Sequence, residues 1–309
     1  MAATVHALRA LKPQAGAALL LAMLTVALVA AVATQAFWQQ WRGTETEAAT
    51  RAHLQARWLL NGGLEWARVR LRQDALRGGA DHLAEPWAVP IRNAPIGEVF
   101  AGAPGGAAMP AAIISLEIID LQSRLNVLNL LEGPQLSPAW LAAFERLFAT
   151  LGLPAAELRR FGENLRLAGL AGPDSGISPL PQHPAQLVNL GLAPATLKAL
   201  LPFITVLPGR VPVNLNTASM PVLKAVLPDL MGAGAERLIS LRGSQPLQSM
   251  AQANAGTPVE GMLSISSRFF EASVELDFGN YRMAEHALLQ REGLDVRTLW
   301  HRRVAAAPR

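Results

Sequence analysis

The sequence predicts an α+β protein in which one long N-terminal helix packs on an antiparallel sheet and a large all-α domain is inserted among the strands. Three observations lead to this prediction. An uncharged, mostly apolar run extends from Pro13 to Trp41, and a strictly alternating segment covers Phe270 to Asp277. Between the strand-like regions, residues 123–257 form a series of short helical patterns separated by Pro and Gly.

The apolar run is long enough to cross a membrane as a helix. Its core is Ala17 to Phe37, and about 20 apolar residues in a helix span roughly 30 Å of hydrocarbon. A cleaved secretory signal has an apolar region of only about 7–15 residues, and a soluble core helix of this length would carry charges. We therefore expect a membrane span. Arg9 and Lys12 precede it, which predicts a cytoplasmic N-terminus with the bulk of the chain on the other side.

A helical pattern continues beyond the span, from about Gln39 to Leu76. Its charged residues surround one apolar stripe, which predicts that this half of the helix packs on a sheet or on another helix. The stripe consists of Leu54, Trp58, Gly62 and Trp66, with Leu60, Leu64 and Leu71 on the same side. Gly62-Gly63 predicts a kink, and Gly78-Gly79 predicts the end of the helix.

An irregular connector and then a strand follow the long helix. Residues 81–110 contain many turn residues, including Pro86, Pro90 and the Ala103–Gly106 segment. Residues 113–121 are rich in Ile and predict a strand.

The middle of the chain is predicted to be helical. Ser137 before Pro138 is typical of a helix N-cap, and Thr217 is expected to cap a later helix. The loop at 171–176 separates two groups of helices. The expected helices are 139–151, 154–167, 183–190, 194–201, 218–227, 234–241 and 247–253.

Strand patterns return near the C-terminus. In residues 270–277 apolar and polar side chains alternate with a period of two, so one face of this strand is expected to be buried. Two further strands are predicted at 281–290 and 296–303, with turns at 279–280 and 292–293, before a tail at 305–309.

The composition argues against several classes of function. The chain of 309 residues has no cysteine, which excludes disulfides and cysteine metal sites, and its net charge of +4 comes without a long basic run. Six scattered histidines show no ligand spacing, and no nucleophile or phosphate-loop motif is present. We therefore predict that the protein is not an enzyme.

No cofactor is predicted with certainty, but calcium is a candidate ligand. If the strands at 113–121 and 270–277 pair, Glu271, Glu275 and Asp277 would lie near Glu117 and Asp120. Carboxylate oxygens are the ligands that calcium prefers. The alternative, which we favour, is a solvated face of the sheet.

The segment from Val213 to Arg242 resembles a helix-hairpin-helix module of DNA-uptake and repair proteins. Gly232-Ala-Gly234 would form the hairpin, where backbone N–H groups can approach a phosphate. Only Arg237 and Arg242 supply positive charge nearby, so we favour a packing module that binds no nucleic acid. The alternative function is a membrane-anchored DNA-binding protein of an uptake system, whose affinity for duplex DNA would fall steeply with salt.

Four segments together resemble the type II secretion system minor pseudopilin K, or GspK, family over nearly the whole chain. Gly16 followed by Ala17 resembles a prepilin junction, and Leu21 stands at the fifth mature position, where most pilins have glutamate. Residues 81–90 resemble an Asp…Glu-x-Trp-Ala-x-Pro segment of the family. Two asparagine boxes complete the resemblance: Asp120, Asn126 and Asn129 in the first, and Asn214 and Asn216 in the second.

The resemblance implies a domain organisation and a pilin-like fold for the helix and sheet. The expected divisions are a leader at 1–16, a transmembrane half-helix at 17–37, the first part of the core at 38–122, and the closing strands at 258–304. Residues 123–257 would be the inserted domain, with a SAM-like or helix-hairpin-helix-like fold.

The resemblance also implies a role at the tip of a pseudopilus in the bacterial inner membrane and periplasm. A prepilin peptidase would cut between Gly16 and Ala17, and Ala17 would then be N-methylated. The expected partners are the I and J minor pseudopilins and the inner-membrane secretion machinery; nucleic acid is not expected. In pilins the glutamate pairs with the N-terminus of a neighbour, so Leu21 suits a tip subunit that has no neighbour above it.

Overall fold

The computed structural model describes residues 15–102, 111–170, 179–227, 233–253, 261–279 and 281–304. The chain divides into two units, Met1–Arg57 and Trp58–Arg309. Several sequence-based expectations lie outside the described residues: most of the leader, the loop at 171–176, Gly232 of the hairpin, Asn280 of a turn, and the tail at 305–309.

The first unit is helical over its described residues. Helix α1, Ala15–Arg77, is 63 residues long and begins in this unit. Within the described residues, one helix is long and apolar enough to cross a membrane, and its apolar part is exposed throughout. The hydroxyls of Thr25 and Thr34 donate to the carbonyls of Ala22 and Ala30, both at 2.8 Å. These bonds satisfy the hydroxyls without water, as a lipid environment requires.

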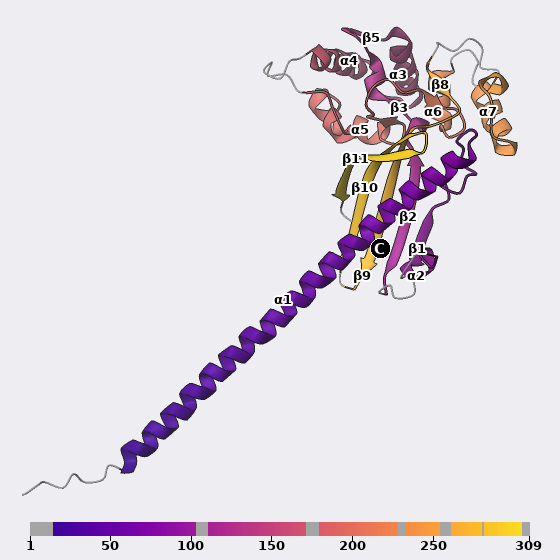
Figure 1. Ribbon diagram of the computed structural model, residues 1–309. Helices are drawn as coiled ribbons and strands as arrows, with labels where there is room; N and C mark the ends of the chain where they lie inside the picture. Colours follow the sequence, from indigo (N-terminus) through magenta and orange to yellow (C-terminus); the bar gives the residue numbers. More distant parts are fainter. Residues whose placement is uncertain are drawn as a thin grey trace, which may run out of the picture. The chain divides into compact units, whose positions relative to one another are not determined.

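The second unit contains the C-terminal part of α1 and a five-stranded sheet (Figure 1). The strand order is β1-β2-β9-β10-β11, and every neighbouring pair is antiparallel. The strands are β1 (Ile91–Pro95), β2 (Ile113–Asp120), β9 (Phe269–Phe278), β10 (Tyr281–Glu292) and β11 (Asp295–Val304). The predicted long helix and antiparallel sheet are therefore confirmed, and the three C-terminal strands lie where the alternating pattern placed them.

The face of α1 that packs on the sheet differs in detail from the predicted stripe. Leu60, Leu64, Ala67 and Leu71 are buried as a set spaced by three and four. Trp58, which we expected in the stripe, is 74% exposed. The buried set is offset from the Trp-containing row because small and branched residues allow a closer approach to the sheet.

Gly63 allows α1 to approach the sheet closely and does not interrupt the helix. Helix α1 continues through Gly62 and Gly63, where we predicted a kink. A Cβ atom at Gly63 would lie 2.7 Å from Cγ1 of Val274 and 3.0 Å from Cδ2 of Leu116, whereas one at Gly62 would meet nothing within 4 Å. Gly63 is thus the point where the helix backbone lies against the sheet.

The predicted connector contains two elements that the sequence did not predict. Strand β1 and the one-turn helix α2 (Ile96–Val99) lie in the region that we expected to be an irregular connector. β1 pairs only with β2 and carries a register shift between Ile91 and Ala94. Proline and asparagine are poor strand formers, but an edge strand tolerates them.

Between β2 and β9 the chain forms a helical middle region with its own apolar core (Figure 1). Trp140, Phe144, Phe148 and Phe161 are among its largest buried side chains. Its longer helices are α3 (Pro138–Thr150), α4 (Ala155–Leu170), α5 (Pro194–Leu200), α6 (Met220–Val226) and α7 (Ala233–Ser244). The segments η2 (Leu121–Ser123), η3 (Val127–Leu130), η4 (Pro184–Leu190) and η6 (Met250–Ala253) are 3₁₀ helices.

Short strand pairs connect distant parts of the middle region. β3 (Leu125–Asn126) pairs in parallel with β6 (Ile204–Thr205), and β7 (Val213–Asn214) pairs in parallel with β8 (Leu263–Ser264). β4 (Leu131–Glu132) and β5 (Gln135–Leu136) form a small hairpin. The first pair joins the start of the middle region to residues 204–205, and the second joins residues 213–214 to the segment before β9.

Candidate functional site

A network of buried polar side chains lies where the chain leaves the sheet and where it returns. Asp120, the last residue of β2, is its centre and is 2% exposed. One oxygen, Oδ1, accepts from the backbone N–H of Gln122 at 2.7 Å, which caps η2. Burial raises the pKa of the Asp120 carboxyl to about 6, although its hydrogen bonds act in the opposite direction.

The second oxygen of Asp120 collects three donors from distant segments. Oδ2 accepts from Nδ2 of Asn214 at 3.1 Å, from Oγ1 of Thr217 at 2.5 Å and from Oγ of Ser267 at 2.7 Å. Thr217 was expected to cap a helix, but α6 begins after Ser219, and the Thr217 hydroxyl is used here instead. The carboxylate therefore connects the end of β2 to residues 214–217 and to Ser267, which lies just before β9.

Asn214 extends the network in two directions. Its Nδ2 also donates to the carbonyl of Asp81 at 3.1 Å and to Oγ of Ser267 at 2.9 Å, while its Oδ1 accepts from the N–H of Asn216. The side-chain amide of Asn214 is thus bonded through both its Nδ2 and its Oδ1. A side chain of this kind is costly to bury unless its groups are bonded in this way.

Asp81 connects the network to α1 through Arg291 on β10. Arg291 donates to Asp81, to Oδ2 of Asp74 at 2.8 Å and to the carbonyl of Ser267 at 2.9 Å. Asp81 Oδ2 also accepts from the N–H of Ser267 at 2.6 Å. Burial raises the pKa of the Asp81 carboxyl, and the charge of Arg291 opposes that effect.

The asparagines of the first box hold a different segment. Asn126 Oδ1 accepts from the N–H of Leu207 at 2.9 Å, and its Nδ2 donates to the carbonyl of Gly209 at 2.8 Å. Asn129 bonds Val211 in the same reciprocal way, at 2.9 Å from its N–H and 2.7 Å to its carbonyl. Both side chains replace backbone partners for residues 207–211, which lie outside any strand or helix.

Asn216, the last residue of the two boxes, connects to the region before η6. Its Nδ2 donates to the carbonyl of Leu247 at 3.0 Å, and its Oδ1 accepts from the N–H of Leu247 at 2.9 Å. The five box residues are thus all buried and bonded, and each connects two segments that are distant in sequence.

Among the described residues, three carboxylates meet at one place, formed by Asp74, Asp81 and Glu85. Their oxygens lie within 4.8 Å of one another, and the Arg291 guanidinium already bonds two of them. Burial raises the pKa of the Glu85 carboxyl to about 7, and this carboxyl accepts from the Trp87 indole at 2.8 Å. The guanidinium of Arg291 thus provides the positive charge beside these carboxylates, and we interpret the cluster as structural.

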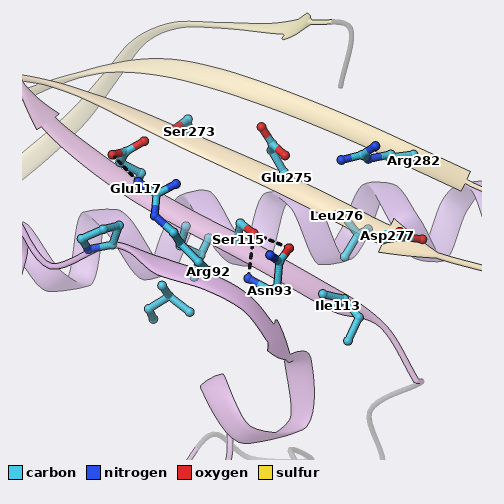
Figure 2. A pocket seen from close by; sticks show the side chains of 13 residues that line it. Arg92, Asn93, Ile113, Ser115, Glu117, Ser273, Glu275, Leu276, Asp277 and Arg282 are labelled. Atoms are coloured by element: carbon cyan, nitrogen blue, oxygen red, sulfur yellow. Dashed lines mark hydrogen bonds and ion pairs between the residues drawn. The ribbon is translucent and has the colours of Figure 1, made fainter. Parts of the chain in front are cut away.

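Two of the calcium candidates, Glu275 and Asp277, lie on the sheet face away from α1 (Figure 2). The strands β2 and β9 pair as that hypothesis required, but Glu117 and Asp120 are on opposite faces. Glu275 and Asp277 line a cavity of about 650 Å³ over β1, β2 and β9. Glu271 is further along β9, and a carboxylate oxygen lies 3.4 Å from Nδ1 of His286.

Of the two predicted positive charges in the helix-hairpin-helix-like segment, Arg242 is used in packing and Arg237 is exposed. Arg242 donates to the carbonyl of Leu215 at 2.5 Å, and burial lowers the pKa of its guanidinium. Lys224 is 3.7 Å from a carboxylate oxygen of Glu236. These contacts support the packing interpretation that we favoured for this segment over phosphate binding.

The proposed processing residues lie at the beginning of α1. Gly16 and Ala17 are within its first turn, and Leu21 is one turn further on, with its side chain 63% exposed.

Sequence reasoning missed four members of the buried network: Asp74, Thr217 as a carboxylate partner, Ser267 and Arg291. Asp74 and Arg291 are 217 positions apart and belong to separate elements. One signal was available: an Asp and an Arg at strand or helix positions that are otherwise apolar indicate a buried pair.

Comparisons with known proteins agree with this architecture. Residues 213–268 match the family model for "Type II secretion system (T2SS), protein K". The matched segment includes Asn214, Asn216, Thr217 and Ser267 of the network.

Two curated relatives are similar over most of their length. The Type II secretion system protein K of Pseudomonas aeruginosa is 28% identical, with 90% of this chain and 89% of that protein covered. The Klebsiella pneumoniae protein of the same name is 26% identical, covering 91% of this chain and 93% of the relative.

A solved structure has the same fold. A chain in the crystal structure of the GspK-GspI-GspJ complex from the enterotoxigenic Escherichia coli type 2 secretion system superposes with a TM-score of 0.62. The match covers 84% of this chain and 99% of that chain at 19% identity. The family match, the relatives and the fold agree with one another, and along about nine-tenths of its length the chain is similar to type II secretion system protein K.

Proposed function

We propose that this protein is a minor pseudopilin at the tip of the type II secretion pseudopilus, where it helps to initiate assembly and export across the outer membrane. The observation that carries the proposal is one architecture: an exposed apolar helix that continues into a sheet-packed helix, followed by a bulky helical middle region. A filament subunit needs the first two parts, and a large head on the sheet suits a terminal position. The role is structural and not enzymatic.

The partners follow from the solved relative. That relative is part of a complex named GspK-GspI-GspJ, and we propose that this chain binds the corresponding I and J minor pseudopilins of its own system. The test is co-expression of the full chain with both partners, extraction in detergent and size-exclusion chromatography. Co-elution of all three is expected. Separate elution of this chain would contradict the proposal, and retention on duplex DNA with a steep salt dependence would favour the DNA-uptake alternative.

The apolar part of α1 anchors the protein in the inner membrane. We propose a single span with a cytoplasmic N-terminus and a periplasmic bulk. Arg9 and Lys12 support this orientation. Because the chain has no cysteine, single cysteines at position 6 and at an exposed position such as Arg303 can report topology in cells without a prepilin peptidase, where the leader is retained. Only the second should react with a membrane-impermeant maleimide in intact spheroplasts.

Gly16 and Ala17 form the proposed processing site. We expect a prepilin peptidase to cut between them and to leave N-methylated Ala17, together with contact to the inner-membrane secretion machinery. Mass spectrometry of the N-terminus after co-expression with the peptidase tests this. An intact Met1 end, or a cut well beyond Ala17, would contradict it. The Gly16→Val variant is the matched control, since a β-branched side chain at the cleaved position should leave the leader uncut.

Leu21 is proposed to mark the tip position. An unpaired carboxylate within lipid costs several kcal/mol unless a neighbour neutralises it, so a subunit with no neighbour above gains nothing from glutamate there. The Leu21→Glu variant should assemble or secrete less well than the wild type, and Leu21→Met should behave as the wild type. Equal secretion by Leu21→Glu would refute this explanation.

The helical middle region is proposed to be an inserted domain of about residues 123–257, between core segments 38–122 and 258–304. Its separate apolar core supports this division, and its α6–α7 part is the proposed helix-hairpin-helix-like, or SAM-like, portion. Expression of 123–257 alone tests it: a cooperative thermal transition is expected. A chain without a transition would show that the region depends on the sheet.

A further inference from the structure

A second cavity lies where the middle region meets the sheet, on the face away from α1. Its volume is about 300 Å³, and it is bounded by η4 and α5 on one side and by β9, β10 and β11 on the other. Leu121, Leu197 and Leu288 supply apolar walls. The cavity is therefore large enough for one or two side chains of a ligand.

A β-bulge aims two side chains of β11 into this cavity. Thr298 pairs with Leu289, but the next pair is Trp300 with Leu288, so Leu299 is an extra residue. Without this extra residue, the side chains of residues 298 and 300 would lie on the same face of the sheet. The bulge places Trp300 and Arg302 on the cavity face, beside Leu288 and His286. Bulges often re-aim side chains in this way next to binding sites.

The cavity contains more positive charge than its own acidic group can balance. Arg124 and Arg302 both line it, and neither side chain makes a hydrogen bond or ion pair with any residue in the described part of the chain. The Arg302 guanidinium lies 5.5 Å from the centre of the Trp300 ring. Arg124 is half-buried, so its charge is only partly hydrated.

The remaining titratable groups do not neutralise these two charges. Burial alone would raise the pKa of the Glu271 carboxyl, but the His286 contact and the two arginines hold it below its usual value. Burial lowers the pKa of the His183 imidazole, which accepts from the N–H of Ala185 at 3.1 Å. At neutral pH the site thus has two guanidinium groups and one carboxylate, which His286 already contacts.

The open cavity of Figure 2 differs in this respect. There Arg92 is 3.4 Å from Glu117, and Glu275 and Asp277 lie near Arg282, so acidic groups outnumber basic ones. The same sheet face therefore has one acidic end and one basic end, and only the basic end has an aromatic ring and apolar walls beside its charges.

We propose that the cavity at Arg124, Trp300 and Arg302 binds the C-terminal carboxylate of a partner polypeptide whose last side chain is apolar. Guanidinium groups bind carboxylates with strong, directional hydrogen bonds. The leucines and Trp300 would receive the apolar side chain. β11 is the last strand of the sheet order, so its outer backbone groups can pair with an extended segment, which favours a peptide over a free acid.

Fluorine NMR of the full chain in detergent micelles tests the proposal. The chain contains seven tryptophans; 5-fluorotryptophan labels all of them, and Trp300→Phe identifies the Trp300 resonance. N-acetyl-leucine, a minimal apolar carboxylate, should shift that resonance in a saturable manner. N-acetyl-leucinamide, which lacks the charge, should bind at least about tenfold more weakly.

The variant Arg124→Gln/Arg302→Gln should lose the response to N-acetyl-leucine, and Arg282→Gln is the matched control at the other end of the same face. An equal response to acid and amide, a response that survives the double substitution, or no response at all would overturn the proposal. A spectrum with unchanged dispersion confirms that the double variant is folded.

A five-residue peptide with a C-terminal leucine carboxylate tests the polypeptide part. It should bind at least about tenfold more tightly than N-acetyl-leucine, and N-methylation of its alternate amides should remove that gain. If the peptide is no tighter than the single residue, the occupant is not a chain terminus. These measurements use no other pseudopilin, so their result is distinguishable from a failure of the tip assignment.

Discussion

Helix α1 and the middle region are attached to the same sheet by different physical means. The helix packs mainly through apolar side chains and a glycine, with Leu60, Leu64 and Leu71 buried, and the ion pair between Asp74 and Arg291 lies at its C-terminal end. The middle region is connected through buried polar side chains around Asp120 and Asn214, beside a small apolar cluster in which Leu207 and Val211 meet Phe269 and Leu288. The first attachment depends on area and volume, and the second depends on whether individual atoms find partners.

This difference indicates which of the two attachments tolerates substitutions least. Apolar packing tolerates exchanges of similar volume, whereas removing one member of a buried polar network leaves its partners unsatisfied. Substitutions should therefore be tolerated least at the polar attachment, which connects the middle region to the sheet.

The largest effect is expected for Asp120→Ala. The change leaves the Asn214, Thr217 and Ser267 donors without this acceptor, and we expect a loss of about 3–4 kcal/mol of unfolding free energy. Thermal unfolding in detergent, followed by near-ultraviolet circular dichroism, measures it. Asp120→Asn is the matched control, because it keeps an oxygen toward the three donors and should cost about 1 kcal/mol. Equal losses for the two variants would contradict a role for the acceptor atom.

Gly63→Ala should have the next largest effect. Its Cβ would lie 2.7 Å from Val274 Cγ1, so helix or strand must move, at a cost of about 2 kcal/mol. Gly62→Ala has nothing within 4 Å and should gain up to about 1 kcal/mol from helix propensity. The same thermal measurement compares them. Stabilisation by both substitutions would show that α1 and the sheet are further apart than described.

The pH dependence of stability should distinguish the two attachments. Asp120 has a pKa of about 6 in the folded protein against 3.8 for the ordinary group, so between these values the folded state binds more protons. Stability should rise as pH falls from 7 to 5, by about 1 kcal/mol from this group. Glu85, whose pKa is raised to about 7, acts in the same direction.

Carboxyls with lowered pKa values, such as Glu271, are ionised in both states across this range and contribute nothing there. Asp120→Asn should therefore reduce the slope between pH 7 and 5 and leave the part due to Glu85, whereas Gly63→Ala should leave the slope unchanged. A wild-type protein that loses stability as pH falls from 7 to 5 would contradict the assignment.

The smallest effect is expected far from both attachments. Arg297 contacts Asp295 at 2.6 Å, with both side chains more than half exposed. Asp295→Asn should change the unfolding free energy by less than about 0.5 kcal/mol. A larger loss would mean that the hairpin between β10 and β11 contributes more to the fold than its surroundings indicate.

The sequence was sufficient where a local pattern extended over many residues, whereas single-residue signals such as Gly62-Gly63 and Thr217 were misread. The alternation at residues 270–277 and the apolar run from Ala17 predicted a strand and a helix whose positions the structure confirms. Strand β1 was missed because Arg92, Asn93 and Pro95 have low strand propensity, and only pairing with β2 makes them extended.

The network could be predicted only in part. The family resemblance singled out Asp120 and the asparagines, but their partners come from residues about 30 to 150 positions away, such as Ser267 and Leu247. A single sequence contains no local signal for such contacts. The bulge at Leu299 is a similar case, because it depends on register between two strands.

Hydrogen exchange of the Asn214→Ala variant tests the comparison most directly. Asn214 contacts the middle-region attachment and not α1. We predict at least about tenfold faster exchange in peptides covering 213–218 and 263–268, with unchanged exchange in 114–118 and 272–276, under α1. Equal acceleration in both sets, or in neither, would contradict the claim that polar side chains hold the middle region while apolar packing holds the helix.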